Sequence, residues 1–278
     1  MQSSARSSFA TAPIGVFDSG VGGLTILREI QAALPCEDLV YVADAGHLPY
    51  GDKPLEFVRG RAFAITDFLL GLGAKAIVVA CNTATAAAVD ALRERYTVPF
   101  IGVEPAVKPA AAASRSRIIG VLATTATLES ARYAALVDRF AQGTKVLGQS
   151  CAGLADHIER GGLDDAETEE LVRGFVAPLL AAGADTIVLG CTHYPLIAHI
   201  VGKIAGPQVA VIENGTAVAR ELARQLVAHG NLRGEGMGTP TFWASGPIAE
   251  IEQVFPRLWP AHGRVMPLPE TASGSGSA

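Results

Sequence analysis

Two cysteines, Cys81 and Cys191, each end a short apolar run of the kind that forms a buried strand. Residues 69–83 align without a gap with residues 179–193, which lie 110 residues further along, and seven of the fifteen positions are identical, the cysteine included. A single cysteine in such a place is usually a small buried hydrophobe. A period of 110 residues is too long for a solenoid and indicates a duplicated half-molecule. The two cysteines therefore occupy equivalent positions.

A pair of equivalent cysteines favours one class of reaction. Ligands of open parallel sheets bind outside the carboxyl ends of the strands, and two halves that face each other would bring Cys81 and Cys191 to one cleft from opposite sides. A hydrolase with a cysteine nucleophile needs one thiol and one base. Removing a proton from one face of a carbon and returning one to the other needs two equivalent groups, one thiolate and one thiol. The pair predicts stereochemical inversion at a carbon acid.

Polar residues beside the cysteines are candidates for binding a carboxylate and for tuning the thiols. Backbone N–H groups at the start of a helix favour an anion. His193 is a candidate to tune Cys191, and Asp18, at the end of the first expected strand, is a candidate to tune Cys81. Both also have simpler interpretations, Asp18 as a helix cap and His193 as a loop histidine. Three pairs stand where helices are expected to begin: Ser19 with Gly20, Asn82 with Thr83, and Thr192 with His193.

Strand-like apolar runs alternate with longer helical patterns, which predicts an α/β fold with mainly parallel sheets flanked by helices. The pattern at residues 14–16 returns at residues 119–121, so we expect two pseudo-symmetric domains with the active site in the interdomain cleft. The expected organisation is a disordered lead-in (1–13), a first domain (14–104 plus 215–268), a second domain (105–214) and a flexible tail (269–278).

Composition excludes several classes of function. The 278-residue chain is 49% hydrophobic and 18% charged, which is typical of a globular protein. It has no apolar run long enough for a bilayer and no apolar secretory core near its start. A net charge of -5 without a dense Lys/Arg cluster disfavours nucleic-acid binding. Four cysteines without an export signal indicate cytoplasmic thiols, so we expect a cytoplasmic enzyme with no membrane or nucleic-acid partner.

Metal binding is the main rival use of Cys191 and His193. No CxxC or HxxxH pair supplies the remaining ligands, so we expect no metal. A disulfide between Cys81 and Cys191 is conceivable geometrically and is disfavoured in a reducing compartment. The DSGVGG segment resembles a phosphate loop only weakly, because no Lys-Ser or Lys-Thr follows it.

Four motifs in one order, FDSGVGGLTIL, LPYGDK, VACNTAT and LGCTHYP, resemble those of the aspartate/glutamate racemase family, and its glutamate racemases in particular. The resemblance covers roughly residues 14–214. It implies interconversion of L-glutamate and D-glutamate for peptidoglycan synthesis, without pyridoxal phosphate or any other cofactor, in a homodimer. A related enzyme acting on aspartate, a hydantoin or a malonate, or a binding module without activity, stays open as an alternative.

The resemblance also implies roles for individual residues. Cys81 and Cys191 would be the two acid–base residues, each acting in one direction. His193 would assist Cys191, with Glu159 as its orienting carboxylate. The segment before Glu159 departs from the proline-containing version of the family, and residues 211–214 also differ and are given no role. The residues expected to hold glutamate are Asp18, Ser19, Tyr50, Gly51, Asn82, Thr83, Thr192 and His193.

Overall fold

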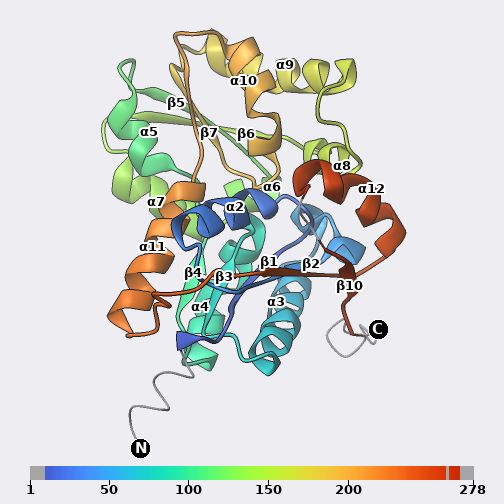
Figure 1. Ribbon diagram of the computed structural model, residues 1–278. Coiled ribbons are helices and arrows are strands. Elements are labelled where there is room, and N and C mark those ends of the chain that lie inside the picture. The colour runs from blue at the N-terminus through green and yellow to red at the C-terminus, as the bar shows by residue number, and fades with distance from the viewer. Residues whose placement is uncertain (1–9, 261–262, 270–278) are drawn as a thin grey trace, which may run out of the picture. The chain divides into compact units, whose positions relative to one another are not determined.

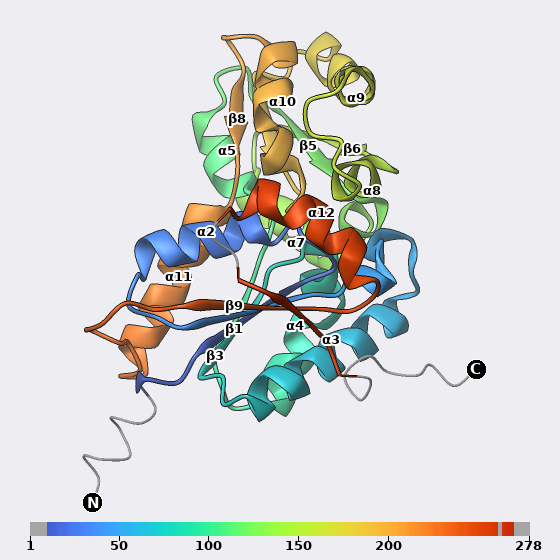
Figure 2. The ribbon, with the colours of Figure 1, turned by 45° about the vertical axis from the view of Figure 1, so that its right-hand side comes forward.

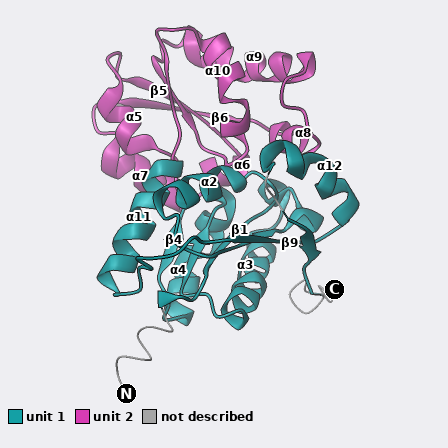
Figure 3. Ribbon diagram, viewed as in Figure 1, with its two compact units in different colours: residues 1–103, 215–278 teal, residues 104–214 magenta. Residues whose placement is uncertain are grey.

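The computed structural model describes residues 10–260 and 263–269. The chain divides into two compact units, unit 1 with residues 1–103 and 215–278, and unit 2 with residues 104–214 (Figure 3). The outer parts of the expected lead-in and tail, residues 1–9 and 270–278, lie outside the described residues. Within the described ranges, no helix is both long enough and apolar enough to span a membrane.

Unit 1 is built on a six-stranded parallel sheet in the order β10-β9-β2-β1-β3-β4. Figure 2 shows α2 on one side of this sheet and α3 with α4 on the other. The strands are β1 (Ile14–Asp18), β2 (Leu39–Ala43), β3 (Ala76–Val79), β4 (Phe100–Gly102), β9 (Pro240–Ala244) and β10 (Val265–Pro267). The helices and turns are α2 (Leu24–Ala33), η1 (Ala45–His47), η2 (Tyr50–Asp52), α3 (Leu55–Gly71), α4 (Asn82–Arg95), α11 (Gly215–Ala228) and α12 (Ile248–Leu258).

Unit 2 is built on a four-stranded parallel sheet in the order β6-β5-β7-β8. Figure 1 labels three of its strands, β5, β6 and β7. Its strands are β5 (Ile118–Ala123), β6 (Lys145–Ser150), β7 (Thr186–Leu189) and β8 (Ala210–Ile212). Its helices and turns are α5 (Val107–Ala113), α6 (Thr125–Leu128), α7 (Ala131–Phe140), α8 (Leu154–Glu159), α9 (Ala166–Ala181), η3 (Tyr194–Ile197) and α10 (Ala198–Ala205).

The two sheets repeat one topology. The order β2-β1-β3-β4 in unit 1 has the same sequence of strands as β6-β5-β7-β8 in unit 2. The α/β fold with parallel sheets that the sequence predicts is therefore confirmed. The C-terminal segment adds β9 and β10 to the sheet of unit 1 only. Cys81 and Cys191 each stand two residues beyond the third strand of the shared pattern, β3 in one unit and β7 in the other.

Matching glycines let a helix lie close against the central strand of each unit. A Cβ on Gly15 of β1 would lie 3.0 Å from Leu69 Cδ1 of α3. A Cβ on Gly120 of β5 would lie 2.6 Å from Leu179 Cδ1 of α9. Leu69 and Leu179 are the first residues of the repeated segment, so the duplication extends to the packing of helix on sheet.

A buried ion pair lies at the amino ends of the strands of unit 1. Lys75, just before β3, donates from Nζ to Glu37 Oε2 at 2.5 Å, and both side chains are fully buried. Lys75 Nζ also donates to the carbonyl of Ala10, and the Lys75 backbone N–H donates to Pro13. Glu37 Oε1 accepts from the backbone N–H of Arg233. The pair thus ties the start of the described chain and the segment before β9 to the sheet.

Candidate active site

Cys81 lies at the carboxyl end of the sheet of unit 1, immediately before α4. Its side chain is 4% exposed, and its thiol donates to Ser19 Oγ at 3.7 Å. The Ser19 hydroxyl in turn donates to Asp18 Oδ1 at 3.3 Å. Asp18 ends β1, the strand beside β3, so parallel pairing brings its carboxylate to the edge where Cys81 emerges. A short hydrogen-bonded chain therefore connects Asp18, Ser19 and Cys81.

Asp18 also fixes the loop that carries Ser19. Its Oδ1 accepts from the Ser19 backbone N–H at 2.7 Å, and its Oδ2 accepts from the Gly23 N–H at 2.6 Å, just before α2. Gly23 has to be glycine, because a Cβ there would lie 2.7 Å from Asp18 Cβ and 2.8 Å from Tyr41 Oη. Asp18 thus accepts backbone N–H groups before α2, as a helix cap does, and it is also connected to Cys81 through the Ser19 hydroxyl.

Asn82 is buried beside Cys81 with its amide unsatisfied. It is 5% exposed, and neither its Oδ1 nor its Nδ2 has a hydrogen-bond partner among the described residues. A buried polar group without a partner costs about 1–3 kcal/mol, so native structures rarely keep one without a reason. Asn82 begins α4, and Thr83 after it is also buried. This end of α4 therefore offers an unused donor and acceptor to a polar ligand.

Tyr50 and Gly51 form the short turn η2, which packs against α4. Tyr50 is 2% exposed and belongs to the same hydrophobic core as Cys81. Its hydroxyl donates to Asp44 Oδ2 at 2.5 Å. Burial, the charge of Asp44 and this hydrogen bond hold the pKa of Tyr50 well above its ordinary value, so the phenol stays protonated. The sequence analysis missed Asp44. The signal that could have identified it is its position directly after β2, at the same carboxyl end of the sheet as Asp18.

Cys191 carries a different hydrogen-bonded chain in unit 2. Its Sγ lies 3.7 Å from His193 Nδ1, and His193 Nε2 lies 2.7 Å from Glu159 Oε2 at the end of α8. Burial acts to lower the pKa of His193, but the hydrogen bonds and negative charges of Cys191 and Glu159 outweigh it and raise the pKa well above 6.5. A protonated imidazole between two acceptors can stabilise a thiolate or deliver a proton to it.

Cys151 is the other buried thiol of unit 2. Burial raises its pKa to about 12, and the negative charge of nearby Cys191 adds to this in spite of the hydrogen bond from Tyr194. Cys151 therefore stays a thiol at physiological pH. Thr192, between Cys191 and His193, is buried as well. In the part of the chain that the structure describes, no group of three or more His, Cys, Asp or Glu side chains is placed to hold a metal ion.

The raised pKa of His193 predicts a pH-dependent effect of Glu159→Gln. A His whose folded pKa is raised adds stability that is fully present below its unfolded value of about 6.5 and is lost as the pH rises through the raised pKa. Removing the Glu159 charge lowers that pKa. We expect the variant to lose about 1.5–3 kcal/mol of unfolding free energy near pH 6, and less at alkaline pH. Urea denaturation over a pH series measures this.

The matched control for this variant is Asp164→Asn. His199 Nε2 lies 2.8 Å from Asp164 Oδ1, but both side chains are more than half exposed. We expect a loss below about 1 kcal/mol. A deficit of Glu159→Gln that stayed constant from pH 6 to alkaline pH would contradict the role of the His193 charge.

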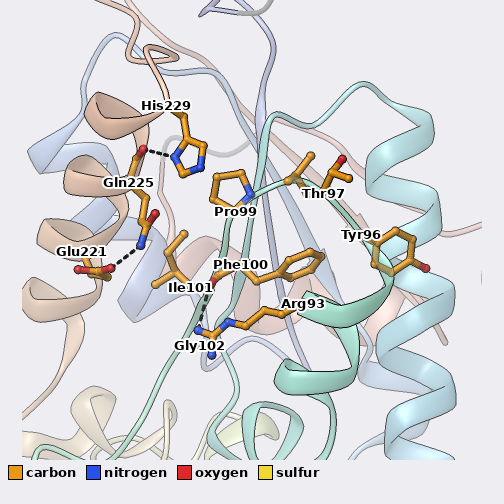
Figure 4. A pocket seen from close by; sticks show the side chains of 11 residues that line it. Arg93, Tyr96, Thr97, Pro99, Phe100, Ile101, Gly102, Glu221, Gln225 and His229 are labelled. Carbon is orange, nitrogen blue, oxygen red and sulfur yellow. Dashed lines mark hydrogen bonds between the residues drawn. The ribbon is translucent and has the colours of Figure 1, made fainter.

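A hollow of about 380 Å³ lies elsewhere in unit 1 and contains none of the expected site residues (Figure 4). It lies between the end of α4, β4 and α11. In Figure 4, Gln225 lies between Glu221 and His229, and Arg93 extends to the backbone carbonyl of Phe100. Both cysteines of the pair are absent from its lining, so we assign it no part in the chemistry.

The structure thus groups the expected residues by unit. Six of them accompany Cys81 at the carboxyl ends of β1 and β3 or on the adjoining turn and helix: Asp18, Ser19, Tyr50, Gly51, Asn82 and Thr83. Three accompany Cys191 at the carboxyl end of β7: Thr192, His193 and Glu159. Each unit therefore supplies one cysteine together with its own polar partners.

Comparison with known proteins identifies the family. The model of the Asp/Glu/hydantoin racemase family matches residues 17–222, which include both cysteines. The chain belongs to this family. A glutamate racemase of Methylococcus capsulatus is 54% identical over 258 residues, which cover 92% of this chain and 95% of that protein.

Solved structures of the Asp/Glu/hydantoin racemase family share the fold. The glutamate racemase isoform RacE1 of Bacillus anthracis superimposes with a TM-score of 0.83 and 34% identity, over 92% of this chain and 96% of that one. The Escherichia coli glutamate racemase, in complex with L-glutamate and the activator UDP-MurNAc-Ala, gives a TM-score of 0.81 and 30% identity, over 92% and 97%.

Proposed function

We propose that this chain is a glutamate racemase, an isomerase that interconverts L-glutamate and D-glutamate by two-cysteine proton transfer and without a cofactor. The observation that carries the proposal is the equivalent position of Cys81 and Cys191 after the third strand of a repeated topology, each with its own polar partners. The relative that is 54% identical over 92% of this chain is a glutamate racemase, and the Escherichia coli relative binds L-glutamate. The product D-glutamate serves peptidoglycan synthesis.

In this mechanism the two thiols act on opposite faces of the α-carbon of glutamate. One cysteine, as thiolate, takes the α-proton, and the other, as thiol, delivers its proton to the opposite face, so the two exchange charge states in each turnover. The reverse direction uses them in the opposite order. Thiols suit this work because their pKa lies near enough to neutrality for both forms to be reached.

The neighbouring groups support each charge state. The Ser19 hydroxyl donates a hydrogen bond to Asp18. The Ser19 oxygen can therefore accept a hydrogen bond from the S–H group of Cys81. The protonated His193 stabilises the thiolate that Cys191 becomes after it has given up its proton. Asn82 and Thr83, at the start of α4, hold a carboxylate of glutamate and help to stabilise charge that develops at the α-carbon. Gly51 and Thr192 complete the set that holds the substrate.

We further propose that the enzyme works as a homodimer in the cytoplasm. Both statements rest on the resemblance to the family and on the thiol chemistry, which requires reduced cysteines. Size-exclusion chromatography with light scattering tests the dimer directly.

Incubation with L-glutamate in D₂O tests the proposed activity. The protein is dialysed free of pyridoxal phosphate and metals, and optical rotation and α-carbon deuterium are followed together. We expect rotation to vanish while deuterium enters the α-position. Absence of exchange from glutamate would overturn the proposal, and exchange from aspartate instead would assign the protein to another substrate within the same family.

A further inference from the structure

A buried polar cluster lies beside the Tyr50 turn in unit 1. Its centre is Asp44, which is fully buried. Oδ2 of Asp44 accepts from the Tyr50 hydroxyl at 2.5 Å and from Arg61 Nε at 2.8 Å. Oδ1 accepts from Arg61 Nη2 and from Ser245 Oγ, both at 2.7 Å, and lies 3.1 Å from His47 Nδ1. We call these five residues, Asp44, His47, Tyr50, Arg61 and Ser245, the Asp44 cluster.

The cluster joins segments that are distant along the chain. Asp44 follows β2, Arg61 comes from the middle of α3, and Ser245 follows β9 of the C-terminal segment. The guanidinium of Arg61 makes two parallel bonds to the carboxylate of Asp44, which fixes the orientation of the carboxylate as well as its position. Oδ2 is thereby aimed at the hydroxyl of Tyr50.

Stability alone does not account for this pair. Arg61 is 4% exposed, and its remaining nitrogen, Nη1, is buried without a hydrogen-bond partner among the described residues. A buried ion pair often contributes less to stability than apolar side chains of the same volume, and an unmet N–H group adds a further cost. What the pair supplies is a fixed geometry.

Tyr50 connects the Asp44 cluster to the candidate active site. The turn η2 packs against α4, the helix that follows Cys81, and the charge of Cys81 affects the pKa of Tyr50. Burial acts to raise the pKa of Asp44, but hydrogen bonds from His47, Arg61 and Tyr50 and the charge of Arg61 bring it below its usual range. Asp44 stays ionised and the Tyr50 phenol stays protonated. The Tyr50 hydroxyl thus donates to Asp44 and its ring packs in the core, so the part of the turn that is left to bind a substrate is its backbone.

We propose that Asp44 and Arg61 are positioning residues that hold the turn of Tyr50 and Gly51 in the place where it binds glutamate, an inference that rests on the proposed function. The pair acts through the Tyr50 hydroxyl and touches neither the substrate nor the cysteines. Loosening the turn weakens binding of the ground state and the transition state alike, so it raises KM and leaves kcat nearly unchanged.

The variants Tyr50→Phe and Asp44→Asn test this positioning role. Tyr50→Phe removes the hydroxyl that donates to Asp44, and Asp44→Asn removes the charge that makes this hydrogen bond strong and that holds Arg61. We expect each to raise KM for glutamate about 10-fold, with kcat changed less than about threefold. The double variant should be no worse than the poorer single variant, because both act on the same link. The control is Tyr96→Phe, which removes a 2.6 Å hydroxyl bond to Asp67 in the same unit, and it should leave KM unchanged.

Amide hydrogen exchange of the peptide that covers residues 44–55 provides a second readout without substrate. We expect faster exchange in Tyr50→Phe and Asp44→Asn than in the wild type, and no change in Tyr96→Phe. In a wild type that racemises glutamate, an unchanged KM in both variants overturns the positioning role and leaves the proposed function standing. In a wild type without activity on glutamate the proposed function fails, and the exchange alone decides whether the pair holds the turn. Unchanged exchange in both variants overturns the proposal in either case.

Discussion

Racemisation of glutamate should fall by a factor of about 10²–10⁴ when either Cys81 or Cys191 is replaced by serine, since this is the usual contribution of one positioned acid–base group. A serine hydroxyl keeps nearly the size of the thiol but is a far weaker acid, so it can neither take nor deliver the α-proton at neutral pH. Both residues are buried, at 4% and 8% exposure, and the near-isosteric change should leave the fold intact. Polarimetry of both enantiomers measures the rate, and circular dichroism checks the fold.

Cys36→Ser is the matched control for both variants. Cys36 is a half-buried free cysteine outside the candidate site, and its replacement should leave the rate unchanged. Near-full activity in Cys81→Ser or in Cys191→Ser would rule out the two-base mechanism.

Proton exchange separates the roles of the two cysteines further. In Cys81→Ala, we expect deuterium exchange at the α-carbon to be only partly impaired for the enantiomer whose proton Cys191 removes, and strongly impaired for the other. The reason is that each thiol faces one side of the carbon in this mechanism. Equal loss from both enantiomers would argue against face-specific roles, even if the overall rate had fallen as expected.

The repeated cysteine segment made much of the fold predictable from the sequence. Fully buried strands such as β1 and β7 show as mainly apolar runs, because strands inside a parallel sheet are covered on both faces. Some of the shortest elements carry no such signal. The strand β10 has only three residues, and the turns η1 and η2 have three each, so hydrophobic periodicity cannot reveal them. Their positions depend on tertiary contacts instead.

The same distinction separates the parts of the site that were predictable from those that were not. Cys191 and His193 are two residues apart, and their proximity is visible in the sequence. The Asp44 cluster was missed, because Arg61 lies in a helix of mixed character, where an arginine usually indicates a solvated face. Its charge is met by the carboxylate of Asp44, 17 residues away, which also accepts from the hydroxyl of Ser245 in the C-terminal segment. The unsatisfied amide of Asn82 likewise becomes visible only once its surroundings are in place.

Stability should depend heavily on the ion pair between Lys75 and Glu37, at the opposite end of the strands from the cysteines. We expect Lys75→Met to lower the free energy of unfolding by about 3–5 kcal/mol, because it leaves the carboxylate of Glu37 buried without its charge partner. The variant also removes the donor to the carbonyl of Ala10. Urea denaturation measures the change.

Two further variants distinguish the effect of burying the charges from the effect of the ion pair itself. Lys203→Met removes an ion pair with Glu169 of similar length, 2.6 Å, but Lys203 is 66% exposed, so we expect a loss below about 1 kcal/mol. Adding Glu37→Gln to Lys75→Met should recover a large part of the loss, because a neutral amide can still accept from the Arg233 N–H and no charge stays buried. Two outcomes would contradict this explanation: a loss of unfolding free energy below about 1 kcal/mol in Lys75→Met, or a double variant that is less stable than Lys75→Met alone. Either would show that the cost of burying an unpaired Glu37 charge is not the reason for the ion pair.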